Sequence, residues 1–211
     1  MKARRVLFIV ASLALAICIG VNPAAADYAI SSFTSTSVSS QSPMSLGWSF
    51  TTNSAVTVNA LGYYDYQQNG LVDQHIVGIF NASGTLLAST PVSSGTVDPL
   101  NGSYRYASIT PITLAAGQTF TIAATTVGYS DYWLFGTNSQ FTVNSAISLI
   151  AGQYVYGGGS LQDPANHNFG WFYAPANFRI APTSSVPLPP SLLLLAPGLF
   201  GLVGMRRKFQ K

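Results

Sequence analysis

The sequence predicts an all-β fold, a single antiparallel β-sandwich or jelly-roll-like domain over residues 27–182, and three observations support this class. The region is rich in Ser and Thr, joined by Val, Ile, Tyr and Phe, and these residues suit a pleated, half-buried surface better than a helix. Apolar and polar residues alternate in segments such as 56–61, as a sheet with one solvent-facing side requires. Only 7% of the chain is charged and Glu is absent, which excludes coiled coils and long exposed helices.

Short runs of β-forming residues recur along this region, separated by turn signals such as Asn69-Gly70 and Asp98-Pro99. We expect strands at residues 28–38, 47–51, 56–64, 75–80, 86–90, 104–109, 118–125, 132–135, 153–156 and 177–180. The sequence has no repeat of the solenoid or propeller type and no internal linker, so one domain is the simplest organisation.

A signal peptide is predicted at residues 1–26. A cationic start precedes an apolar run at 6–20, and Ala24 and Ala26 place small residues where signal peptidase reads them, which predicts cleavage after Ala26. The apolar run is short for a helix that spans a bilayer, so a retained anchor is disfavoured. The only cysteine, Cys18, lies in this segment after a bulky residue, which disfavours a lipoprotein signal. The mature chain would therefore have no thiol for disulfides, catalysis or zinc.

The other end, residues 183–211, combines a proline motif, an apolar stretch and a basic terminus. The proline motif consists of Val186, Pro187, Leu188, Pro189 and Pro190, and the basic cluster consists of Arg206, Arg207 and Lys208. Prolines keep the motif extended, and the uncharged residues 192–205 that follow predict a hydrophobic helix in the membrane. The basic cluster holds its side in the cytoplasm during export, while internal Pro and Gly residues make this helix a poor permanent anchor.

This tail closely resembles the PEP-CTERM sorting signal, in the variant whose motif reads Val-Pro-Leu-Pro-Ala. Leu188 stands where the more usual motif has Glu, and Pro190 replaces the Ala of the variant. The resemblance implies processing by an exosortase in Gram-negative bacteria that make extracellular polysaccharide. It also implies transient anchoring in the inner membrane and delivery to the cell envelope or extracellular matrix, in a biofilm context. A plain C-terminal membrane anchor is the alternative, and it would also leave the domain outside the cytoplasm.

The middle of the chain resembles a second family. The residues that carry this resemblance are 48–50, 61–65, 70–71, 75–80, 84–89, 104–106, 111–117 and 176–180. They are similar to the uncharacterised DUF4082-type β-sandwiches often found ahead of this sorting tail, over residues 27–181. The resemblance implies a β-sandwich and carries no activity with it.

The placement of charges excludes nucleic acid as a partner. The net charge of +3 comes from the two ends of the chain, whereas the region between them has two arginines, Arg105 and Arg179, against six aspartates and no lysine. Nucleic-acid binding needs clustered Lys or Arg to neutralise phosphates, and two isolated arginines do not supply such a cluster.

Aspartates are the only carboxylates that could act as acid and base in a hydrolase. Asp65 and Asp73 are the closest pair in sequence, and the turn between them could bring them together, although a simple connecting loop is the favoured interpretation. Oxygen atoms of Asp65, Asn69 and Asp73 could also hold calcium, but EF-hand spacing is absent. We therefore expect no metal, no cofactor and no enzymatic activity, and keep an Asp-based hydrolase as an alternative.

The two histidines, His75 and His167, have neither a thiol nor a second histidine at metal-ligand spacing. His75 adjoins an apolar strand, where a hydrogen-bonded structural role is favoured over a metal-ligand role, and His167 lies in a polar segment that predicts a loop. The glycine run at 157–159 predicts a flexible turn because it lacks the lysine of a P-loop. No Gly-x-Ser-x-Gly elbow occurs in the chain.

Aromatic residues are the one enriched class that suits a binding function. Tyr132 and Trp133 offer flat apolar faces with polar rims, which suit sugar rings as well as protein cores, although packing is favoured for any single residue. Neighbours in a strand face opposite sides, so Tyr63 and Tyr64 cannot both lie in a two-layer core unless a further segment covers one. We expect an exported protein of unknown molecular activity. The leading alternative is a carbohydrate-binding module that uses Tyr132, Trp133 and the 65–73 loop, with extracellular polysaccharide as its partner.

Overall fold

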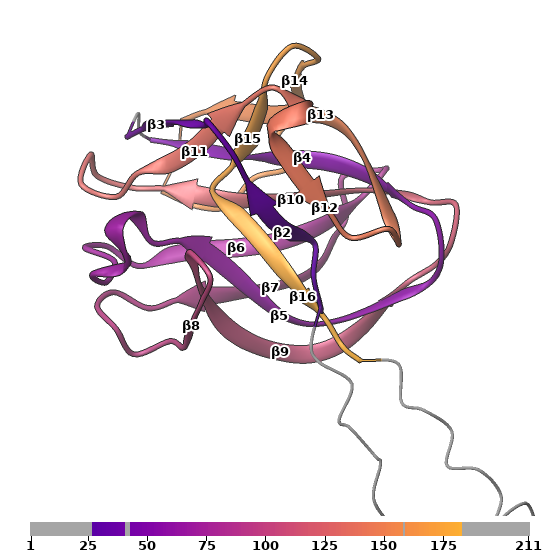
Figure 1. Cartoon of the computed structure of the whole chain (residues 1–211), viewed down its shortest axis with the longest axis horizontal. Helices are drawn as coiled ribbons and strands as arrows, with labels where there is room; N and C mark the ends of the chain where they lie inside the picture. The colour runs from indigo at the N-terminus through magenta and orange to yellow at the C-terminus, as the bar shows by residue number, and fades with distance from the viewer. Residues whose placement is uncertain (1–26, 41–42, 158, 183–211) are drawn as a thin grey trace, which may run out of the picture. The chain divides into compact units, whose positions relative to one another are not determined.

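The computed structural model describes residues 27–40, 43–157 and 159–182, which form strands joined by turns (Figure 1). These residues contain no α-helix, and their only helical turns are the 3-10 turns η1 (Tyr66–Gln68) and η2 (Asn138–Gln140). Their strand pairs are antiparallel, so the predicted all-β class with antiparallel sheets is confirmed. The predicted signal peptide and C-terminal sorting helix lie outside the described residues. No helix within the described part is long and apolar enough to cross a membrane.

Most strands belong to two large sheets. The first has the order β1 (Asp27–Tyr28), β16 (Ala176–Ile180), β5 (Val56–Tyr64), β9 (Tyr104–Leu114) and β8 (Leu100–Asn101). The second has the order β14 (Asn166–Asn168), β13 (Ile147–Tyr156), β4 (Met44–Thr52), β10 (Thr119–Thr126), β6 (His75–Asn81) and β7 (Leu86–Val92). Two small sheets pair β15 (Phe172–Ala174), β11 (Trp133–Gly136) and β3 (Ser37–Ser39), and β12 (Phe141–Val143) with β2 (Ile30–Phe33).

A shared apolar core joins the two large sheets. Trp48 and Phe50 of β4 pack their rings against Phe178 of β16, with ring centroids 5.9 and 5.2 Å apart. All three side chains are fully buried. The indole N–H of Trp48 donates to the Ala176 carbonyl oxygen at 2.9 Å, so its one polar group is satisfied inside the core. This bond ties a strand of one sheet to a strand of the other.

Several strand boundaries differ from the sequence prediction for structural reasons. The strand expected at 28–38 is split into β1, β2 and β3, and Ser35, whose φ of 52° interrupts the extended backbone, separates β2 from β3. β9 continues past Pro111, at a register shift between Val58 and Ala60 of β5 that tolerates a residue without an N–H. His167 lies in β14, so the prediction of a loop there is wrong.

The outer face of the five-stranded sheet is partly covered by β2. Tyr64 lies against Phe33 of β2 with ring centroids 6.1 Å apart, and Tyr63 points to the opposite side, against β6. Both tyrosines are buried, because β2 supplies the covering segment that adjacent aromatic residues need. The buried amide of Asn177 holds β2 in place by accepting the Ile30 N–H and donating to the Ile30 carbonyl, both at 2.9 Å.

Candidate functional site

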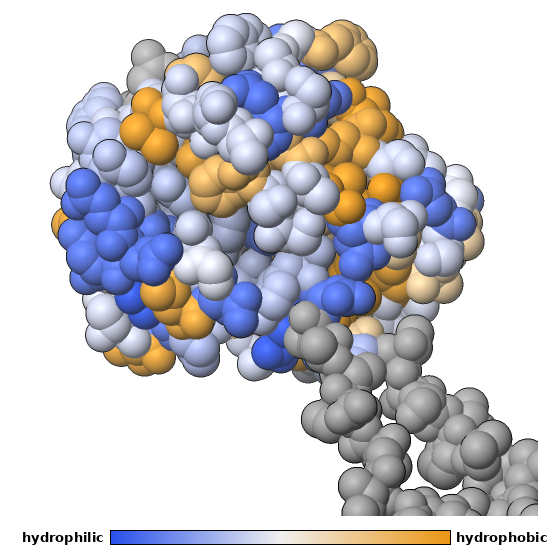
Figure 2. Space-filling model, in the orientation of Figure 1, coloured by the Kyte–Doolittle hydropathy of each residue, from blue (hydrophilic) through white to orange (hydrophobic). Residues whose placement is uncertain are grey.

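The turn after β5 is strained and exposed. Gln67 and Gln68 have φ values of 63° and 60°, a left-handed conformation that costs a residue other than Gly on the order of 1–3 kcal/mol. The strong hydrophilic patch in Figure 2 lies over this loop, where both glutamines are exposed. Asp65 holds the turn from its first position: its carbonyl accepts the Gln68 N–H at 3.1 Å, and its Oδ2 accepts the Gly70 N–H at 3.0 Å.

A buried ion pair anchors Asp65. The Nε of Arg105 donates to Asp65 Oδ2 at 2.7 Å, and the two side chains are 5% and 1% exposed. Arg105 belongs to β9, which pairs with β5 so that Arg105 lies opposite Tyr63. A second guanidinium nitrogen, Nη1, donates to the Asp98 carbonyl at 3.0 Å. The carboxylate of Asp65 is therefore engaged by a cation and by the turn that it caps.

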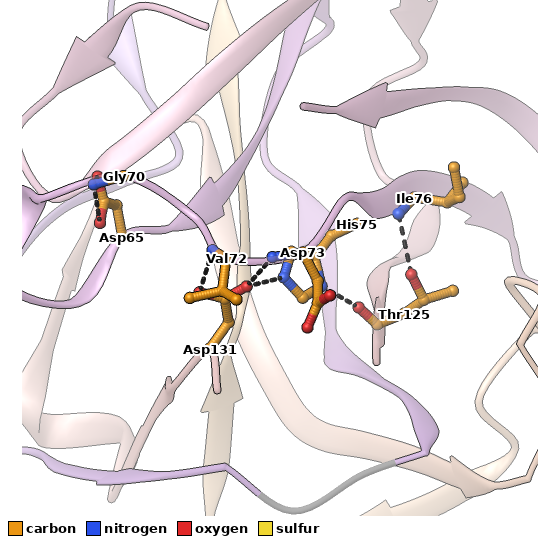
Figure 3. A network of polar contacts seen from close by, with 8 residues as sticks. All are labelled: Asp65, Gly70, Val72, Asp73, His75, Ile76, Thr125 and Asp131. Carbon is orange, nitrogen blue, oxygen red and sulfur yellow. Dashed lines mark hydrogen bonds and ion pairs between the residues drawn. The ribbon is translucent and has the colours of Figure 1, made fainter. Parts of the chain in front are cut away.

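A second buried pair lies on the other side of the loop (Figure 3). His75 of β6 contacts Asp131 Oδ2 through Nε2 at 3.0 Å and the Thr125 carbonyl through Nδ1 at 2.8 Å. The same carboxylate accepts the backbone N–H groups of Val72 at 2.9 Å and Asp73 at 2.7 Å. The expected hydrogen-bonded role of His75 is confirmed, and the pair fixes the segment that leads into β6.

The proton arrangement of this pair follows from its contacts. A carbonyl oxygen only accepts, so Nδ1 of His75 must donate, and Nε2 donates as well when Asp131 is ionised. Burial alone would raise the pKa of Asp131. The hydrogen bonds from His75, Val72 and Asp73 outweigh burial, so the pKa lies below the usual 3.8. The ionised carboxylate of Asp131 is therefore held by His75 and by two backbone N–H groups.

Tyr63 covers the pair from the core side. Its ring stacks on His75 with centroids 3.6 Å apart and planes 6° from parallel. Burial raises the pKa of the Tyr63 hydroxyl well above 10.0, and the charges of Asp131 and Asp73 add to this effect. Among the described residues, the hydroxyl is the one buried side-chain polar atom without a hydrogen-bond partner.

A cavity of about 270 Å³ is lined by residues of the turn and by the segment around Asp131. Tyr66 and Tyr132 face each other there, with ring centroids 4.9 Å apart and exposures of 38% and 36%. Asn69 also lines the cavity. The structure thus brings together two of the residues predicted to bind a ligand, Asn69 and Tyr132, and adds Tyr66.

The other predicted ligand residues lie elsewhere. Asp73 packs its carboxylate against the backbone of Gly128. A Cβ added to Gly128 would lie 2.5 Å from the Oδ2 of Asp73. Figure 3 shows Asp65 and Asp73 at separate points of the network, with Val72 and Asp131 between them. Trp133 is 5% exposed and packs with Met44 and Leu46, because successive residues of a strand point to opposite sides.

These placements limit the chemistry of the loop. Asp65 is committed to Arg105, so it does not form the acid–base pair with Asp73 that the hydrolase alternative requires. In the amide orientation that satisfies both of its groups, Asn69 donates to the Tyr66 carbonyl at 3.1 Å within its own turn. The described residues contain no group of three or more His, Cys, Asp or Glu side chains arranged to hold a metal ion.

The sequence did not indicate Arg105 or Asp131 as residues of the site. One sequence feature could have indicated an ion pair. The region between the two ends has only two arginines, and an arginine that is buried in such an apolar domain needs a carboxylate partner. Which aspartate it finds depends on strand pairing, which single-sequence patterns do not determine.

A family described as a domain of unknown function, DUF4082, matches residues 31–171. No curated protein matches the chain.

Proposed function

The chain belongs to the DUF4082 family, and we propose that it is an exported, non-enzymatic protein of the cell envelope or extracellular matrix, sorted by an exosortase-type enzyme. The observation that carries the proposal is the order of four features: signal peptide, β-domain, proline motif with apolar stretch, and basic terminus. The charge-poor composition and the absence of cysteine after residue 18 are compatible with a location outside the cytoplasm. The tail's resemblance to a PEP-CTERM signal adds the exopolysaccharide or biofilm context.

We expect mass spectrometry of the protein recovered from cells and medium to show an N-terminus at Asp27 and no residues beyond the proline motif. Signal peptidase removes residues 1–26, and the exosortase removes the apolar stretch and the basic cluster. A double variant, Pro187→Ala with Pro189→Ala, should keep its full C-terminus and stay in the membrane fraction. The control Ser184→Ala lies outside the motif and should be processed normally. Recovery of the intact 211-residue chain from the cytosol would contradict the proposal.

Carbohydrate binding is the second candidate, and the cavity between Tyr66 and Tyr132 favours it. The two partly exposed rings offer apolar faces to the C–H groups of a sugar, while tyrosine hydroxyls and the Gln67 and Asn69 amides surround them with hydrogen-bonding groups. The one charged side chain that lines the cavity, Asp131, is already engaged by His75 and by the backbone N–H groups of Val72 and Asp73. These properties suit a neutral, polyhydroxylated ligand. An Asp-based hydrolase gains no such support, because Asp65 is paired with Arg105.

Tyr132→Ala is expected to weaken binding on an array of neutral glycans at least about tenfold, which corresponds to about 1.4 kcal/mol. The substitution removes one of the two facing rings and leaves the core intact. Tyr129→Ala is the matched control, because Tyr129 is 69% exposed and does not line the cavity. Equal binding by the two variants would contradict the site. Trp133→Ala is a poor probe of binding: it empties a buried site and should cost about 3–5 kcal/mol of stability instead.

A further inference from the structure

A second hollow lies on the outer face of the five-stranded sheet. Its volume is also about 270 Å³, and it lies between β2 and the turn that joins β8 to β9. Tyr104, Tyr106 and the half-buried Tyr28 contribute its aromatic surface. Tyr106 can lie flat over β5 because Gly62 has no side chain; a Cβ there would approach the Tyr106 ring to 2.7 Å.

An unbroken row of tyrosine rings connects this hollow with the cavity between Tyr66 and Tyr132. The row consists of Tyr132, Tyr66, Tyr64, Tyr104, Tyr106 and Tyr28, and successive ring centroids are 4.9, 6.4, 5.6, 6.3 and 4.8 Å apart. Tyr64, Tyr104 and Tyr106, in the middle of the row, are 6%, 3% and 6% exposed, so they support the end rings more than they contact solvent. The exposed faces are at the two ends. The two hollows are therefore two ends of one packed aromatic unit.

The groups around the row favour a neutral ligand. Serine hydroxyls and the Asn101 and Asn177 side chains line the second hollow, and no charged side chain lines it among the described residues. In the first cavity Asp131 is paired with His75. A protein partner would normally present charged or large apolar groups, and an acidic polymer would need cations that this surface lacks. Repeated sugar rings, which have apolar C–H faces and uncharged hydroxyl rims, match the tyrosine rings and the uncharged polar groups that line the two hollows.

We propose that the two hollows bind different segments of one neutral polysaccharide chain, and that the buried tyrosine row is the rigid support that holds the two hollows at a fixed spacing. This inference rests on the carbohydrate-binding candidate and extends it from a single-sugar cavity to an extended site. A ligand that occupies both hollows binds more tightly than a ligand that occupies one. Once the first hollow is filled, the second contact forms within the same complex.

The test uses neutral oligosaccharides of one to eight residues with gluco, manno and galacto linkages, and measures binding to the purified mature domain by calorimetry. We expect affinity to rise at least tenfold from the shortest to the longest members of the best-bound series. Tyr28→Ala, at the far end of the row, should reduce long-chain affinity to the short-chain level and leave short chains unaffected. Tyr132→Ala should weaken both, whereas Tyr129→Ala should change neither. Thermal melts of each variant check that it is folded.

The possible results separate the two claims. Length-independent binding, or long-chain binding that Tyr28→Ala leaves unchanged while Tyr132→Ala abolishes it, would overturn the extended site and leave the single-sugar cavity standing. Preference for acidic polysaccharides over every neutral series would overturn the assignment of a neutral chain. The absence of binding to any oligosaccharide would overturn both the extended site and the carbohydrate-binding function.

Discussion

Arg105→Ala is expected to reduce the free energy of unfolding by about 3–5 kcal/mol, because it leaves the buried carboxylate of Asp65 without its cation. The loss should extend beyond the pair. Asp65 also caps the turn that contains the left-handed Gln67 and Gln68, and an Asp65 without its cation would hold that turn less firmly. Urea denaturation of the mature domain measures the change, and glycan binding through Tyr66 should weaken in the same variant.

The chain supplies a matched control in its other described arginine. Arg179 is half-buried and its Nε donates to the neutral Asn59 Oδ1 at 2.7 Å, so Arg179→Ala leaves no buried charge behind and should cost only about 1 kcal/mol. The double variant Arg105→Ala with Asp65→Asn should recover part of the loss, because the orphaned charge is gone. Equal destabilisation by the two arginine variants would show that the ion pair does not stabilise the fold as we infer.

The fold class was accessible from the sequence because it depends on properties that a single strand displays. Val56–Tyr64 coincides with β5, because apolar and polar residues alternate in its first half and two aromatic residues, which favour strands, end it. The short strands are different. β12 and β14 have three residues each and exist only because β2 and β13 lie beside them. Their pairing is a tertiary effect, and local patterns do not contain it.

The sequence could predict residues of the candidate site only from the chemistry of their side chains. Asn69 and Tyr132 were indicated because amides in turns and aromatic pairs suit ligand binding, and both line the cavity. Their meeting depends on Asp131 reaching His75 across the fold. Trp133 was predicted on the same grounds as Tyr132, because both are aromatic. In β11, however, the Trp133 side chain packs in a separate apolar cluster. Residue type gave the candidates, and strand geometry decided between them.

The pair of His75 and Asp131 predicts how stability depends on acid. The pKa of Asp131 is lower in the folded protein than its ordinary value of 3.8, so the folded state favours the ionised carboxylate. The stability that this provides is fully present above that ordinary value and is lost as the pH falls through the lower, folded-state pKa. We therefore expect the free energy of unfolding, measured in urea from about pH 7 to about pH 2.5, to decline below about pH 4.

Asp131→Asn should cost about 1.5–3 kcal/mol at neutral pH, because His75 loses a charged acceptor, and it should flatten the decline in acid. Asp163 is the matched control of opposite sign. Burial raises its pKa, against a smaller opposing effect of His167, so its protonation favours the folded state as the pH falls. Asp163→Asn should therefore make the acid decline steeper. If both variants changed the acid-induced decline in the same direction, the decline would reflect general charge repulsion rather than the protonation of Asp131.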